Sequence, residues 1–149
     1  MTECNGEPIG FSRLGRKNVV ADFAGGTITS DAGGLLLREA DRRLGLTRAL
    51  ADVIPDPRQP ALITHEQRTM IAQRVIGIAL GYEDVNDHQT LRHDPLLQTL
   101  SEKTPDPQEP LASPPTLGRL ENRVGRKALV RMSKVLVESF VASFDSPPD

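Results

Sequence analysis

The sequence predicts a mainly α-helical fold that begins with a short β-hairpin. Apolar residues recur at helical spacing in several segments after residue 30, and most of these segments end at a glycine or before prolines. A β-like run at residues 19–23 is followed by Gly25 and Gly26 and then by a second short run at 27–29. One hairpin and a set of helices are therefore the elements that we expect.

Composition divides the 149 residues into four parts. Residues 1–29 are expected to form a flexible arm and the short β segment, and residues 30–103 a helical region. Residues 104–115 contain five prolines, which exclude regular structure and predict a linker or an exposed loop. Residues 116–149 are expected to form basic amphipathic helices.

The first predicted helix begins at Ser30 or Asp31, which are good N-caps, and ends at Gly45. Its apolar side repeats at helical spacing and consists of Leu35, Leu36, Ala40 and Leu44. Its polar side consists of Arg38, Asp41, Arg42 and Arg43. We therefore expect the leucines to pack inwards and the arginines to face solvent.

Further helices are predicted along the rest of the chain. A short helix covers 47–53, and a longer one covers about 65–80, beginning at a capping box of Thr64 and Gln67 and ending at Gly81. Helices at 116–124 and 126–144 are separated near Gly125. The last helix carries an apolar stripe of Leu129, Met132, Leu136, Phe140 and Phe144, which would be an exposed apolar patch if the helix lacks its partner.

Residues 81–97 crowd acidic groups and histidines between a helix end and a helix restart. Because carboxylates and imidazoles bind divalent cations, a metal site is one interpretation of Glu83, Asp84, Asp87, His88, His93 and Asp94. The two histidines are five residues apart, however, and so lie poorly on one helical face. Capping of helix starts by Asp84 or Asn86 and by Asp94, which precedes Pro95, explains the pattern better. We assign no metal ligand here.

Two groups of basic residues are candidate DNA contacts. The net charge of −2 provides no global attraction for nucleic acid, so a DNA-binding surface must be local. Basic pairs four residues apart share a helical face and can neutralise phosphates, although a solvated helix face is the ordinary alternative. The candidates are Arg38, Arg42, Arg43, Arg119, Arg123, Arg126, Lys127 and Arg131.

Other classes of function find no support in the sequence. Cys4 is the single cysteine, which excludes an internal disulfide and a cysteine-based zinc cluster. There is no signal peptide, no apolar run near the roughly 18 residues of a membrane span, no G-x-S-x-G motif and no Walker lysine. We expect a soluble, cytoplasmic protein with no membrane partner, and we assign no catalytic residue.

Four segments together resemble the N-terminal region of bacterial insertion-sequence transposases of the DDE type (transposase DDE domain, group 1). Residues 81–97, GYEDVNDHQTLRHDPLL, are similar to the family's "GYEDxNDHxxLRxDP" run. Residues 29–41, TSDAGGLLLREAD, and 73–81, QRVIGIALG, resemble two segments upstream of it. Residues 116–122, TLGRLEN, resemble a "STLxRLEN" segment. The similarity spans about residues 19–144.

The resemblance implies a role in DNA transposition. Such transposases cut and join DNA with two Mg²⁺ ions held by Asp, Asp and Glu on an RNase H-like core, which follows the region resembled here. Because no further apolar strand precedes Asp149, we expect a truncated N-terminal part without that core and without a cofactor of its own. The expected partners are the terminal repeats of the element and a second copy or a full-length transposase.

The expected role is DNA-end binding or subunit association without independent cleavage. Two alternatives stay open. The chain could be a stand-alone, non-enzymatic DNA-binding regulator of transposition, or an inactive remnant of a decayed element.

Overall fold

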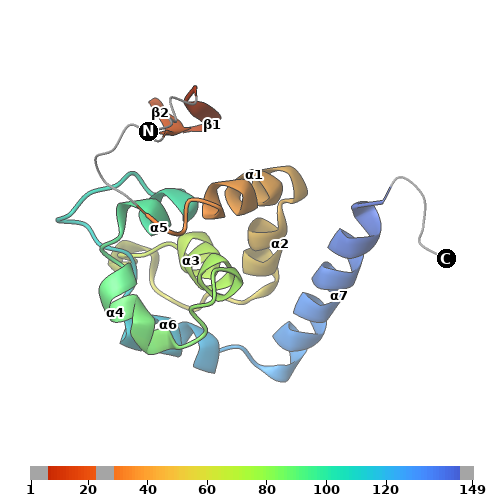
Figure 1. The fold of residues 1–149 in the computed structure, drawn as a ribbon. Helices are drawn as coiled ribbons and strands as arrows, with labels where there is room; N and C mark the ends of the chain where they lie inside the picture. Colours follow the sequence, from red (N-terminus) through yellow and green to blue (C-terminus); the bar gives the residue numbers. More distant parts are fainter. Residues whose placement is uncertain (1–6, 23–28, 145–149) are drawn as a thin grey trace.

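The computed structural model describes residues 7–22 and 29–144 (Figure 1). As predicted, a short antiparallel hairpin precedes a mainly helical fold. In chain order the elements are β1 (Ile9–Leu14), β2 (Lys17–Ala21), α1 (Gly34–Leu44), α2 (Leu46–Val53), the 3₁₀ helix η1 (Pro60–Leu62), α3 (Gln67–Ala79), the 3₁₀ helix η2 (Val85–Asp87), α4 (His88–Leu91), α5 (Pro95–Leu100), α6 (Pro114–Asn122) and α7 (Arg126–Ala142).

The hairpin lies earlier in the chain than predicted. β1 falls inside the predicted arm and pairs with β2, so that Phe11 lies opposite Val19. Gly15 has a φ of 57° in the turn between them, a conformation that favours glycine. The expected second strand lies largely outside the described residues, and Thr29 is not in a strand. The sequence of β1, IGFSRL, hides its strand character because glycine, serine and arginine interrupt the apolar alternation.

Helix α3 is central to the fold and is buried on nearly every side from Met70 to Gly77. Met70 and Ile71 pack in one apolar cluster with α2 and α6, while Ile76 packs in a second with α1 and α5. The predicted capping box is wrong, because Glu66 is the N-cap and the Gln67 side chain bonds to backbone carbonyls of α2 and the residue after it.

Gly45, with a φ of 69°, ends α1 as predicted, but the predicted faces of this helix are partly wrong. Leu35 is buried, yet Leu36 and Leu44 are exposed, and Arg38 is only 1% exposed. The helix begins at Gly34, where a Cβ would collide with Leu100 at 2.6 Å, so Gly34, Leu35 and Arg38 form the buried face.

The proline-rich segment 104–115 has no helix or strand until α6 begins at Pro114, and its end packs into the core. Leu111 and Ala112 are buried and join the two core clusters. The Gln73 amide on α3 pairs with both backbone groups of Ala112, donating to its O at 3.0 Å and accepting from its N at 3.1 Å. These bonds satisfy a buried backbone that forms no ladder of its own.

Helix α7 packs along α2 at the edge of the molecule (Figure 1). Ala128 is buried there, and Met132 and Val135 are half-buried against the core. Only Met132 of the predicted apolar stripe packs against the core, because α2 covers only one side of the helix. The remaining members of that stripe are exposed: Leu129, Leu136, Phe140 and Phe144.

Candidate nucleic-acid interface

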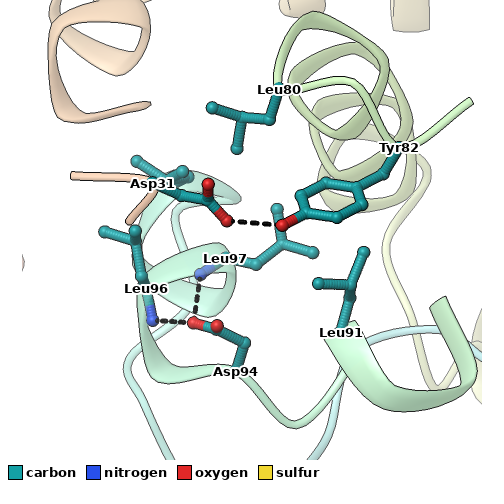
Figure 2. Close-up of a pocket in the computed structure, with 8 residues that line it drawn as sticks. Asp31, Leu80, Tyr82, Leu91, Asp94, Leu96 and Leu97 are labelled. Carbon is teal, nitrogen blue, oxygen red and sulfur yellow. Dashed lines mark hydrogen bonds between the residues drawn. The ribbon is translucent and has the colours of Figure 1, made fainter. Parts of the chain in front are cut away.

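Two of the segments singled out in the sequence meet at one hydrogen bond (Figure 2). The Tyr82 hydroxyl, just after α3, donates to Oδ2 of Asp31, just before α1, at 2.8 Å. This bond to the carboxylate is the main reason that the pKa of Tyr82 is raised. The enclosed space beside the pair is about 10 Å³, room for no more than one water molecule. The junction is therefore packed and offers no ligand cavity.

Asp94 caps α5 beside this bond, as predicted. Its Oδ1 accepts from the N–H groups of Leu96 at 2.6 Å and Leu97 at 3.1 Å (Figure 2). Asp84 caps η2 in the same manner and accepts from the N–H of Asn86 at 2.8 Å. Both carboxylates therefore satisfy free backbone donors at helix starts.

His88 is fully buried between polar side chains of α3. Its Nδ1 lies 3.2 Å from Gln73 Nε2, and its Nε2 lies 3.3 Å from Arg74 Nη1. Burial, and then the charge of Arg74, lower the pKa of His88. In a doubly protonated ring both N–H groups would point at side chains that are themselves donors. The imidazole therefore stays neutral and acts as a structural core group.

The basic candidates on α1 are largely committed to ion pairs within the fold. Arg38 donates to the backbone O of Ser12 at 2.7 Å and to Glu102 Oε2 at 3.2 Å, and its Nε lies 2.9 Å from Glu102 Oε1. Arg42, which is 41% exposed, pairs with the same carboxylate at 3.0 Å. Arg43 is exposed and has no ion pair within residues 7–22 and 29–144. Arg38 therefore holds the hairpin to the helices and does not face solvent as expected.

The basic candidates on α6 and α7 are more accessible. Arg123 is an exception, since it is half-buried, pairs with Asp56 at 3.1 Å and donates to Gln67 Oε1. The other candidates are exposed and have no ion pair to any described residue: Arg119, Arg126, Lys127 and Arg131.

Lys127, Arg131 and Lys134 lie at positions i, i+4 and i+7 of α7 and so share one face, which we call the basic stripe. Lys134 extends the predicted pair of Lys127 and Arg131, because a spacing of three also places two side chains on one helical face. It lies 3.5 Å from Glu138, an exposed pair of little stability.

A family model for "Transposase DDE domain group 1" matches residues 11–149. The chain belongs to this transposase family. The match begins inside β1 and runs through α7, so the hairpin is part of the family's region together with the helices. No curated protein and no solved structure matches the chain. Among the described helices of this transposase chain, none is both long and apolar enough to cross a bilayer.

DDE transposases typically depend on divalent metal ions, but the acidic junction of this family member does not fit one. Two of its carboxylates cap helices, and His88 is enclosed by donors of α3. The described residues contain no group of three His, Cys, Asp or Glu side chains that could hold a metal ion. We therefore assign no step of the reaction to these residues.

Proposed function

We propose that this part of a transposase binds the terminal DNA of its mobile element through the basic stripe of α7, in the cytoplasm, and does not itself cleave DNA. The observation that carries the proposal is the alignment of three cations on one solvent-facing side of a helix. From Lys127 to Lys134 the stripe extends about 10 Å along the axis, which corresponds to roughly three base-pair steps. Each cation that meets a phosphate releases counterions.

The charges elsewhere support a local contact. Three of the basic candidates form ion pairs within the fold: Arg38 and Arg42 share Glu102, and Arg123 pairs with Asp56. The net charge of −2 gives the rest of the surface no attraction for DNA. Arg43 and Arg119 are also exposed and can extend the contact beyond the stripe.

The test is a titration of terminal-repeat DNA with the 149-residue chain, measured by fluorescence anisotropy at several salt concentrations. Replacing Lys127→Gln together with Arg131→Gln should weaken binding and reduce the slope of log K against log salt by about 2, near 0.9 for each lost phosphate contact. Arg68→Gln, at an exposed position on α3, is the matched control and should leave the slope unchanged. An unaltered slope in the double variant would refute the proposal.

Cleavage is tested separately. We expect the chain to produce no strand transfer with terminal-repeat DNA and Mg²⁺ or Mn²⁺, because the carboxylates described above serve caps and ion pairs. Strand-transfer products from the purified chain would contradict this half of the proposal.

A further inference from the structure

Helix α7 presents a second, uncovered apolar face. Five large side chains of α7 and Phe144, just after its end, are between 44% and 65% exposed, and we call them the outer face: Leu129, Val130, Leu136, Val137, Phe140 and Phe144. At 3.6 residues per turn they fall within an arc of about 120°, on the side away from Ala128 and the contact with α2. Phe140 and Phe144 already touch edge to face, with ring centroids 4.9 Å apart. So large a contiguous apolar surface indicates a protein contact.

We infer that the outer face pairs with the outer face of a second copy of this chain, with the two α7 helices antiparallel. Arg126 is the only charged residue of α7 inside the apolar arc, and it lies at the N-terminal end. In a parallel pair the two Arg126 side chains would meet and repel each other. In an antiparallel pair each would approach the C-terminal carbonyls of the other helix, where the macrodipole favours a cation.

The outer face can also pair with itself residue by residue in this orientation. A two-fold axis beside Leu136 and Val137 places Leu129 opposite Phe144 of the second copy. The basic stripe lies outside the arc, so DNA binding and pairing use different sides of α7.

The available area suits a second copy. If each of the six side chains loses roughly 80 Å² of exposed surface, about half of what a large side chain can bury, the pair buries on the order of 1,000 Å², near the lower limit for a specific dimer. Such an area is typical of a weak, reversible dimer.

The test is sedimentation equilibrium of the full chain without DNA. We expect a monomer–dimer equilibrium that Val137→Glu or Phe140→Glu weakens by at least about tenfold, since each buries a charge in the contact. Leu62→Glu is the matched control, because Leu62 is 76% exposed on η1, and it should leave the equilibrium unchanged. A wild-type chain that stays monomeric, or a control that weakens the dimer equally, would overturn the inference.

Cysteine cross-linking tests the orientation, with Cys4→Ser as the background because Cys4 is the single cysteine. Val137→Cys lies next to the proposed axis and should form a disulfide-linked dimer by itself. Leu129→Cys should cross-link only when mixed with Phe144→Cys, whereas a parallel pair would link each variant to itself. Because neither experiment contains DNA, a failure of pairing is distinguishable from a failure of the proposed DNA binding.

Discussion

The His88 ring occupies the space where a side chain at Gly77 would begin. A Cβ at position 77 would lie 3.0 Å from His88 Cε1 and 3.2 Å from Nε2. The ring cannot easily retreat, since Gln73 and Arg74 of the same helix hold its two nitrogens. This contact joins α3 to the start of α4, and it explains why a glycine lies near the end of an otherwise well-filled helix.

Gly77→Ala should therefore destabilise the fold although alanine is the better helix former. We expect a loss of about 1–3 kcal/mol from overpacking against the ring. Gly118→Ala on α6 is the matched control, because its added Cβ meets nothing within 4 Å, and it should stabilise by about 0.5–1 kcal/mol. Urea denaturation of both variants measures the difference, and a stabilised Gly77→Ala would show that the ring moves aside freely.

Glu102→Gln tests the ion pair that holds the hairpin to the helices. The substitution removes the closer countercharge of Arg38, which is 1% exposed and keeps Glu39 at 3.5 Å and hydrogen bonds to backbone carbonyls of β1. Because the carboxylate is itself 32% exposed, we expect a cost of about 1–2 kcal/mol, less than for a fully buried pair.

Glu109→Gln is the control for this experiment, since Glu109 is 72% exposed and pairs only with Lys103. Its effect should stay within about 0.5 kcal/mol. Thermal or urea unfolding gives both values. Equal changes in the free energy of unfolding for the two substitutions would mean that the burial of Arg38 does not require Glu102.

Asp56 makes stability depend on pH in a defined window. Hydrogen bonds from Arg58, aided by Arg123, lower the pKa of Asp56 from its ordinary value of 3.8 to about 2. The unfolded chain therefore binds more protons between these values. The stabilisation of the fold by the Asp56 carboxylate is complete above pH 3.8 and is lost as the pH falls to about 2.

Asp56→Asn should lower stability at pH 7 by about 1–2 kcal/mol, a figure reduced for solvent screening because the side chain is 23% exposed. It should also flatten the loss of stability between pH 4 and 2. Asp52→Asn, at an exposed position on α2, should change stability little at pH 7. Urea titrations over this pH range measure the slope, and parallel curves for Asp56→Asn and wild type would contradict the assignment.

Local chemistry made several features predictable from the sequence. Gly45 and Gly81 end helices because their left-handed φ angles of 69° and 96° suit glycine. Asp84 and Asp94 cap helix starts because their short side chains reach the free N–H groups. The family also followed from short motifs, which the match over residues 11–149 confirms.

Which side chains are buried was decided by tertiary structure alone. Arg38 lies on the side of α1 that the sequence predicts to be polar, yet it is buried. Glu102 and the backbone carbonyls of β1 take the place of the water molecules that would otherwise bind its guanidinium group. Leu111 and Ala112 belong to a proline-rich stretch, yet they are buried because Gln73 pairs with the backbone.

The outer face of α7 also combines a feature that the sequence determined with one that only the tertiary structure decided. The sequence determined that the helix is apolar over much of its circumference, since a periodic pattern depends only on spacing along one helix. It did not determine which part would pack inwards, because that depends on the direction from which α2, distant in the sequence, approaches. The residues that cover one side of a helix lie far from it in the sequence. The spacing of residues within the helix therefore carries no information about them.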